Sequence, residues 1–255
     1  MVADSVGKPY VWKHISAVNW LSGETGVRMS VISFASIKGG VGKTTSLVCL
    51  ADHLAAAGIR AHVIDADLNR HASRMIERMV NKAPSNLLSA EFADEASIRS
   101  RIRTAREEIG AGGAVLVDLP GVAGKITLFG MALSDLVIVP VGPSGLDVTD
   151  AVRTVDLVTE AADFVARSIA VRLLPTRWPI QVETRIARET RRRLEAQVPQ
   201  APLIAVPLML RVQLAEMTMS YQPPRVSDPD GNAAGNVAAV CDAILEALHG
   251  QRVAA

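Results

Sequence analysis

A glycine-rich stretch at residues 36–46, SIKGGVGKTTS, contains the residue types that bind phosphate groups. The usual phosphate-binding loop, G-x-x-x-x-G-K-[ST], has a glycine six positions before its lysine. Counting back from Lys43, that position is Ile37, and a second lysine, Lys38, follows it directly. The stretch therefore predicts a phosphate loop with one departure, and the role of Lys38 is the question that it raises.

This loop lies between an apolar run and a helix-like segment, which is the setting that a phosphate loop requires. Glycines let the backbone wrap tightly, so that successive N–H groups point at phosphate oxygens, and the helix N-terminus adds positive potential. Lys43 can reach the β and γ phosphates, and the Thr44 hydroxyl can ligate Mg²⁺. We expect the following residues to bind nucleotide: Lys38, Gly39, Gly40, Val41, Gly42, Lys43, Thr44 and Thr45.

Carboxylates end two of the apolar runs farther along the chain. VIDADLNR ends one run with Asp65 and Asp67, and AVLVDLPG ends another with Asp118. In an open parallel sheet, ligands bind at the carboxyl ends of the strands. Carboxylates there can hold a metal or orient the attacking water. A single acidic strand end is more often a cap or a surface turn, but three such groups after a phosphate loop favour metal and water chemistry.

The elements that must position these residues are short apolar runs that alternate with helix-like segments. The runs are rich in Val, Ile and Leu with little alternation, which is typical of strands buried on both faces of a parallel sheet. One amphipathic helix is predicted from about Lys43 to Ala57, with Gly58 as its stop. The fold predicted is a single three-layer α/β domain whose mostly parallel central sheet is flanked by helices. The predicted strands are SVISFA (30–35), AHVIDA (61–66), AVLVDL (114–119), LVIVPV (136–141), IAVRLL (169–174) and LIAVPL (203–208).

Composition narrows the class of protein further. The 255 residues are 49% hydrophobic and 21% charged, which is enough to bury a large core, and the net charge of +1 gives no bulk argument for nucleic acid. Cys49 and Cys241 lie in apolar, helix-like stretches, so we expect buried thiols in a reducing compartment. No apolar run reaches the length of a membrane span, and no secretory signal is evident. We expect a soluble, cytoplasmic protein.

Residues 1–28 do not fit the strand–helix scheme. They include Trp12, Trp20 and Tyr10, and Met29 stands just before the first predicted strand. One interpretation is that the natural start is Met29, and the other is that residues 1–28 form a short aromatic segment that docks on a partner. Both stay open, and the predicted organisation is an extension at 1–28 followed by one domain at 29–255 that carries the phosphate loop.

Four stretches carry a resemblance to a known family. KGGVGKTT (38–45), DAD (65–67), VDLPG (117–121) and SDLVIVPVGPSGLDV (134–148) resemble the deviant Walker motifs of the ParA/MinD family of P-loop ATPases. The resemblance extends from about Met29 to the C-terminal helix. It implies ATP and Mg²⁺ as cofactors and a homodimer in which two subunits enclose two ATP molecules.

The resemblance also implies roles for individual side chains. Lys38 would cross the interface to the phosphates of the partner's nucleotide, and Lys43 would bind phosphate within its own subunit. A charge supplied across an interface can raise the rate roughly a thousandfold or more. Asp67 would position the hydrolytic water, so the implied catalytic residues are Lys38, Lys43 and Asp67. Thr44, Asp65 and Asp118 would form the metal shell.

Departures from the usual pattern indicate a branch of the family. Asp67 is followed by Leu-Asn-Arg rather than Pro-Gln, and Asp118 by Leu-Pro-Gly. The DADxNR form and LLPTR (173–177) resemble ParA-like proteins of conjugative and T-DNA-transfer plasmids more than chromosomal ParA. Thr176 and Arg177 are candidates, by position, for reading adenine.

A basic segment, TRIARETRRRLE at 184–195, is predicted to form a helix. By spacing, Arg185, Arg188 and Arg192 share one face, and Ala187, Thr190 and Leu194 lie roughly opposite. ParA relatives use basic residues in this region to bind DNA without sequence preference, and Arg211 is a further candidate. The alternative is a solvated charged face. A second basic segment at 97–108 is diluted by Glu107 and Glu108, so we expect a solvated face there.

The predicted function is a weak, partner-stimulated ATPase that dimerises with ATP, binds non-specific DNA on the nucleoid and serves DNA partition or cargo positioning. A ParB-like or other activating partner is implied. Membrane attachment is not expected, because the final predicted helix, 233–249, carries no Lys or Arg. The alternatives are a ParA-like accessory ATPase of conjugation or DNA transfer and a metabolic ligase or synthetase on the same fold, for which no substrate residues are evident.

Overall fold

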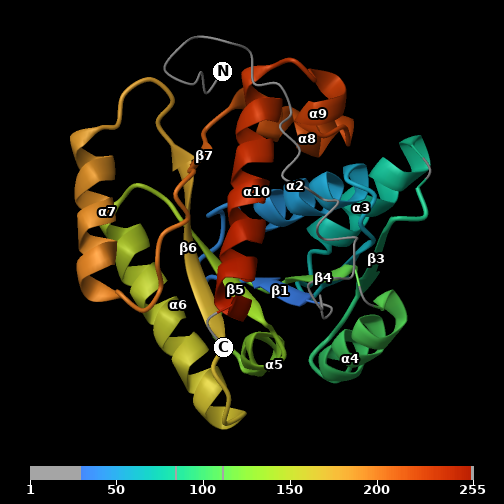
Figure 1. Ribbon diagram of the computed structural model, residues 1–255, viewed down its shortest axis with the longest axis horizontal. Helices are drawn as coiled ribbons and strands as arrows, with labels where there is room; N and C mark the ends of the chain where they lie inside the picture. The colour runs from blue at the N-terminus through green and yellow to red at the C-terminus, as the bar shows by residue number, and fades with distance from the viewer. Residues whose placement is uncertain (1–29, 84, 111, 254–255) are drawn as a thin grey trace.

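The computed structural model describes residues 30–83, 85–110 and 112–253, so residues 1–28 and the choice between their two interpretations lie outside the described part (Figure 1). Its sheet has seven strands in the order β3-β2-β4-β1-β5-β6-β7, and every neighbouring pair is parallel. The strands are β1 Ser30–Phe34, β2 Ala61–Asp65, β3 Leu88–Phe92, β4 Ala114–Asp118, β5 Leu136–Val141, β6 Ala170–Trp178 and β7 Leu208–Met209.

Helices cover both faces of this sheet. One core cluster joins α2, α3, α8 and α10 to one face, and a second joins α4, α5, α6 and α7 to the other. The predicted single three-layer α/β domain is confirmed. The helices are α2 Lys43–Ala56, α3 His71–Lys82, α4 Ile98–Ile109, α5 Lys125–Ala132, α6 Gly145–Phe164, α7 Arg185–Gln197, α8 Val212–Ser220, α9 Pro224–Ser227 and α10 Asn232–Val253.

The central strands read as continuous apolar runs because both of their faces are buried. In β1, Ile32 and Phe34 pack into one core cluster while Val31 packs into the other, and all three are fully buried. The thiols of Cys49 in α2 and Cys241 in α10 are also buried. Burial raises the pKa of Cys49 to about 12, and the nearby Asp52 charge adds to the effect, so this thiol stays protonated.

Three strands differ from the sequence-based prediction by more than a residue or two at their ends. The predicted strand 203–208 is only β7 at Leu208–Met209, with Leu203 making one isolated bridge to Leu173, because Pro202 and Pro207 supply no N–H groups to a ladder. Strand β6 continues to Trp178 instead of ending at residue 174. Strand β3, LSAEF, was not predicted because it lies at the sheet edge and is only partly buried, which gives it little apolar signal.

The parallel order brings all the strand ends that carry chemistry to one edge of the sheet. Strand β4 lies between β1 and β2, and the register places Asp118 beside both Phe34 and Asp65. The glycine-rich loop after β1 therefore emerges next to both carboxylates. None of the helices in the described part of the chain is both long and apolar enough to cross a membrane.

Candidate functional site

The glycine-rich loop turns from β1 into α2 through left-handed backbone. Gly40 has φ 73° and Gly42, the residue before α2, has φ 97°. A side chain at either position would be strained, which explains the glycines. No side chain caps the N-terminus of α2, so its first N–H groups are available to an anion.

Lys43 is held inside this loop. It is buried, and its Nζ donates a hydrogen bond to the Lys38 carbonyl at 3.1 Å. Burial lowers the pKa of Lys43, and the nearby Asp118 and Asp67 charges oppose that shift. An ammonium at this place, with carboxylates close by and backbone N–H groups around it, is suited to bind phosphate oxygens.

Thr44 and Asp118 form the candidate metal site. The Thr44 hydroxyl donates to Asp118 Oδ2 at 2.6 Å, whereas the buried Asp118 Oδ1 has no hydrogen-bond partner within the described residues. Burial raises the pKa of Asp118 to about 7, although the Thr44 hydrogen bond opposes this, and a cation here would favour the charged form. The oxygen donors fit Mg²⁺, which is held by one or two protein oxygens and takes its other ligands from phosphates and water. Among the described residues, no group of three or more His, Cys, Asp or Glu side chains is placed to hold a metal ion.

Asp65 lies beside Asp118 but faces its own loop. Its Oδ1 accepts from the Asp67 N–H at 3.1 Å, and its Oδ2 accepts from the Ser73 N–H at 2.9 Å at the start of α3. Both oxygens of this fully buried carboxylate therefore already have backbone donors. This geometry favours a role for Asp65 in shaping the loop that carries Asp67, and direct ligation by Asp65 stays a prediction.

Asp67 is oriented by a residue that sequence reasoning missed. The backbone N–H and the side-chain amide of Asn69 both donate to Asp67 Oδ1 at 2.9 Å. Asp67 and Asn69 both line the cavity beside the phosphate loop. Asparagine two positions after an acidic residue is a common turn signal, so the spacing could have indicated this contact.

A cavity of about 610 Å³ opens beside the loop. Lys38, Val41, Asp65 and Asp118 do not line it, and Arg211 lies here and not with the arginines of α7. Of the predicted site residues it gathers Gly39, Gly40, Gly42, Lys43, Thr44, Thr45, Asp67, Thr176, Arg177 and Arg211. Sequence reasoning had not selected the other lining residues: Asn69, His71, Gly121, Leu208, Met209, Leu210, Leu214, Ala215 and Thr218.

Gly121 explains one of the departures from the family pattern. A Cβ at this position would lie 3.1 Å from the Gly39 nitrogen and 3.2 Å from the Lys38 carbonyl carbon. The loop after β4 therefore packs backbone against backbone on the phosphate loop, and glycine permits this approach. The Leu-Pro-Gly ending of the Asp118 strand is a packing feature of this site.

Thr176, predicted by position to read adenine, supports the phosphate loop, and its contact with adenine stays a prediction. Its side chain is buried, and its hydroxyl donates to the Val41 carbonyl at 2.7 Å. A Cβ on Gly42 would lie 3.6 Å from the Thr176 Cβ, so the two elements are in close contact. Nothing in the local sequence could reveal this bond, because its partners are 135 residues apart.

We expect Thr176→Val to lower the free energy of unfolding by about 1–3 kcal/mol, because the Val41 carbonyl would lose its partner while staying buried. Nucleotide affinity should fall as well, since the loop would be less firmly held. Urea denaturation and nucleotide titration measure the two effects. Thr190→Val is a matched control, because Thr190 is equally buried but lies in α7. Equal nucleotide affinity in both variants would contradict the bracing role.

Lys38 makes an ion pair within its own chain. Its Nζ lies 2.7 Å from Asp147 Oδ1 and 3.9 Å from Asp150 Oδ2, both in the first turns of α6. Arg177, which lines the cavity, lies 3.7 Å from the same Asp147 oxygen. Burial would raise the pKa of Asp147, but hydrogen bonds from Lys38 and Ser144 and the charges of Lys38 and Arg177 together lower it. Asp147 is not among the residues predicted from the sequence.

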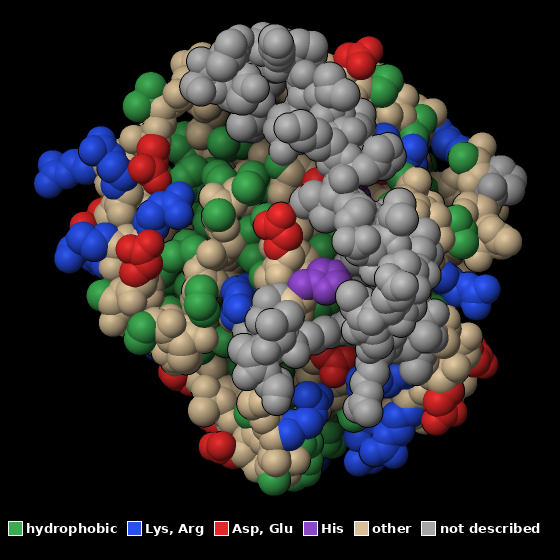
Figure 2. Space-filling model, in the orientation of Figure 1, with side chains coloured by type: hydrophobic (Ala, Val, Ile, Leu, Met, Phe, Trp, Pro, Cys, Tyr) green, Lys and Arg blue, Asp and Glu red, His purple; other side chains and the backbone are tan. Residues whose placement is uncertain are grey.

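The basic face predicted at 184–195 forms as expected. Helix α7 buries Ala187, Thr190 and Leu194 and leaves its arginines around a shallow depression of about 600 Å³. At the left edge of Figure 2, over α7, basic side chains are interleaved with acidic ones. Glu189 accepts from Arg192 at 2.9 Å and from Arg193 at 2.8 Å, which sequence reasoning did not weigh. The i,i+3 and i,i+4 spacing could have shown this pairing.

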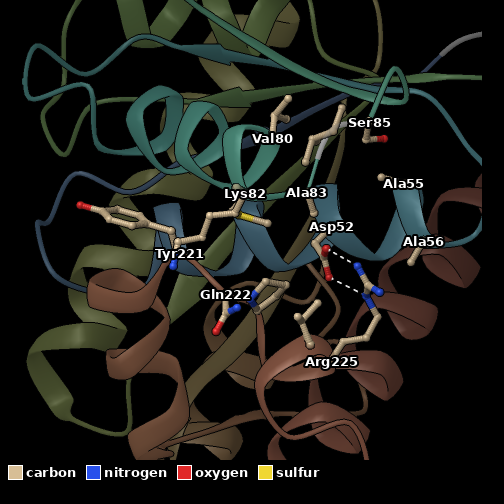
Figure 3. A pocket seen from close by; sticks show the side chains of 14 residues that line it. Asp52, Ala55, Ala56, Val80, Lys82, Ala83, Ser85, Tyr221, Gln222 and Arg225 are labelled. Carbon is tan, nitrogen blue, oxygen red and sulfur yellow. Dashed lines mark hydrogen bonds and ion pairs between the residues drawn. The ribbon is translucent and has the colours of Figure 1, made fainter.

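A second cavity, of about 410 Å³, lies between α2, α3 and α9, away from the phosphate loop (Figure 3). Arg225 donates to both oxygens of Asp52 across it, at 3.0 and 2.7 Å, and Lys82 donates to the Ser220 carbonyl. Arg225 and Asp52 thus satisfy each other, Lys82 is bonded to a backbone carbonyl, and the remaining lining is mostly apolar. These contacts fix α9 on α2 and supply no chemistry for a nucleotide.

Comparisons with known proteins agree with this geometry. ParA of Rhizobium radiobacter is 34% identical over 142 residues, which cover 56% of this chain and 62% of that protein. VirC1 of Rhizobium rhizogenes is 28% identical over 191 residues, covering 74% of this chain and 80% of that protein. The septum site-determining protein MinD of Pyrococcus horikoshii, solved with Mg-ADP, superposes with a TM-score of 0.65 at 16% identity, over 85% of this chain and 96% of that one. The sequence matches the VirC1 protein family over residues 29–220, so the chain belongs to that ParA-like family.

Proposed function

We propose that this chain is an ATP-dependent, Mg²⁺-requiring ATPase of the ParA type. The observation that carries the proposal is the phosphate loop with buried Lys43 and the Thr44–Asp118 pair, at the mouth of a cavity large enough for a nucleotide. Thr44 and Asp118 would hold Mg²⁺, which, when bound, neutralises negative charge on the nucleotide phosphates. Asp67, oriented by Asn69, would hold the attacking water and accept its hydrogen bond.

A homodimer is the second part of the proposal. Three large apolar side chains stand at the same sheet edge as the phosphate loop: Leu68, 85% exposed, and Val122, 58% exposed, lie in loops, and Leu146, 75% exposed, lies in the first turn of α6. They follow β2, β5 and β4, which with β1 form the centre of the sheet. Exposed apolar side chains grouped beside a charged site are typical of an interaction surface. A second copy that brings its own loop to this edge would cover them.

The third part of the proposal is that the ATP-bound dimer holds DNA without sequence preference through α7. Arg185 and Arg188 have no ion pair with any described residue, so their charges are available to phosphates, whereas Arg192 shares Glu189. A DNA-shift assay with ATP, ADP and no nucleotide tests the site, the dimer and the DNA partner together. A shift that does not depend on nucleotide would contradict the proposed coupling.

We expect reversal of Arg185, Arg188 and Arg192 to Glu to weaken DNA binding roughly a hundredfold or more at about 0.1 M salt, because phosphate contacts become repulsive. The wild-type affinity should also fall steeply as salt is raised. The control reverses Arg60, Arg74 and Arg103, which are exposed elsewhere and give the same change in net charge. Equal loss in both triple variants would mean that bulk charge, and not α7, binds DNA.

DNA partition or cargo positioning is the proposed cellular role, and an accessory role in DNA transfer is the alternative. The chain belongs to the VirC1 family, and its DADLNR and LLPTR stretches resemble those of transfer-plasmid relatives. The two roles share one ATPase cycle and differ in the activating partner. Stimulation of hydrolysis by a ParB-like protein would support partition, and stimulation by a relaxase complex would support transfer.

A further inference from the structure

The Asp147 carboxylate joins three segments that lie far apart in the sequence. It accepts from Lys38 Nζ of the phosphate loop at 2.7 Å and from the Ser144 hydroxyl at 2.6 Å before α6. The guanidinium of Arg177 at the end of β6 lies 3.7 Å away. The Asp147 side chain is only 4% exposed, whereas that of Lys38 is 35% exposed. The carboxylate is thus the fixed partner of this pair, and the lysine is the group with room to move.

The backbone around this carboxylate is shaped to admit both cations. A Cβ on Gly142 would lie 2.6 Å from the Arg177 guanidinium and 2.7 Å from Asp147 Oδ2, so a side chain here would force one of the two groups to shift. Arg177 itself has φ 53°, a left-handed conformation that costs a residue with a side chain about 1 kcal/mol or more. Two independent backbone features, the glycine at position 142 and the left-handed conformation of Arg177, thus allow Arg177 to approach Asp147.

This arrangement conflicts with a Lys38 that acts on a partner's nucleotide, because one ammonium cannot serve both anions. A carboxylate at 2.7 Å neutralises the charge that a phosphate would otherwise attract. If Lys38 leaves, however, Asp147 keeps Ser144 and Arg177, so the buried carboxylate is not left without compensation. Release of Lys38 therefore costs less than breaking an isolated buried pair.

We propose that Asp147 is a positioning residue that holds Lys38 within its own chain and releases it when a nucleotide-bearing partner subunit competes for the ammonium. This inference rests on the proposed function, because it presumes an ATP-dependent dimer. Asp150, at 3.9 Å, is a weaker second acceptor on the path of release. The Lys38–Asp147 pair therefore restrains dimerisation. ATP-bound subunits associate only when the phosphates of the partner's nucleotide bind the Lys38 ammonium more strongly than Asp147 does.

Chemical labelling of Lys38 tests the restraint in the monomer without reference to dimerisation. Nucleotide-free protein is treated briefly with an amine-acylating reagent, and modification is quantified by mass spectrometry with exposed Lys125 as internal reference. We expect Asp147→Asn to raise the labelling rate of Lys38 roughly two- to fivefold, the range for losing one partly exposed ion pair. An unchanged rate would overturn the proposal.

The concentration dependence of dimer formation tests whether the Lys38–Asp147 pair restrains ATP-dependent dimerisation. With ATP and Mg²⁺, Asp147→Asn should dimerise at a protein concentration roughly three- to tenfold lower than wild type in sedimentation experiments. Asp156→Asn, an exposed carboxylate on the same helix, should match wild type. If Asp147→Asn instead dimerises only at the same protein concentration as wild type or at a higher one, Asp147 belongs to the assembled dimer site and the proposed restraint is wrong.

Two precautions keep the test decisive. If thermal unfolding shows that Asp147→Asn does not fold, Gly142→Ala replaces it, because the added Cβ crowds both Asp147 and Arg177 and should free Lys38 in the same assays. If wild-type protein never dimerises with ATP, the proposed function fails. The labelling result then still decides whether Asp147 holds Lys38.

Discussion

Replacing Lys43 with alanine is expected to abolish nucleotide binding, with a loss of affinity of about a hundredfold or more, because charge-assisted hydrogen bonds to phosphate disappear. Lys43 is buried in the loop, with Asp118 and Asp67 near enough to affect its pKa. Without its ammonium, those carboxylates would repel the nucleotide phosphates. Titration with a fluorescent ATP analogue in the presence of Mg²⁺ measures the affinity.

Stability separates this effect from misfolding. Burial lowers the pKa of Lys43, which means that desolvation destabilises its charged form in the folded chain. Removal of the side chain should therefore leave the melting temperature nearly unchanged. Lys125→Ala, on the exposed start of α5, controls for the loss of one positive charge. ATP affinity that survives Lys43→Ala would refute the site assignment.

Replacing Lys38 with alanine is expected to leave ATP binding intact but to lower the hydrolysis rate roughly a thousandfold, by comparison with cationic groups that act across an interface. ATP-stabilised dimers should also be lost. Lys38 does not line the cavity of its own chain, and its ammonium points to α6. Its contribution to the chain's own nucleotide should therefore be small. Steady-state hydrolysis and sedimentation with ATP measure the two losses.

Mixing of subunits decides whether Lys38 acts across the interface. Lys38→Ala and Asp67→Ala proteins should each be inactive alone. In a mixed dimer, the nucleotide bound by the Lys38→Ala subunit has Asp67 beside it and receives Lys38 from the other subunit. Hydrolysis restored by mixing would support action in trans. A mixture as inactive as its components, in the presence of mixed dimers, would show that both residues act in one chain.

Much of the site could be predicted from the sequence because phosphate chemistry is local. Gly40 and Gly42 need left-handed backbone, and Lys43 and Thr44 follow them directly, so a few adjacent residues define the loop. The buried runs that become β1, β4 and β5 were equally plain, since both faces of a central strand must be apolar. Edge elements gave weaker signals: β3 is half-buried and β7 is cut short by prolines.

The three-layer fold and the identity of the phosphate loop follow from the sequence alone, because both depend on adjacent or periodic residues. The contacts of Lys38 and Thr176 follow from the tertiary structure. Their partners Asp147 and Val41 lie 109 and 135 residues away, and strand order and register bring them together. No local sequence pattern predicts these two contacts, because they depend on which strands become neighbours in the sheet.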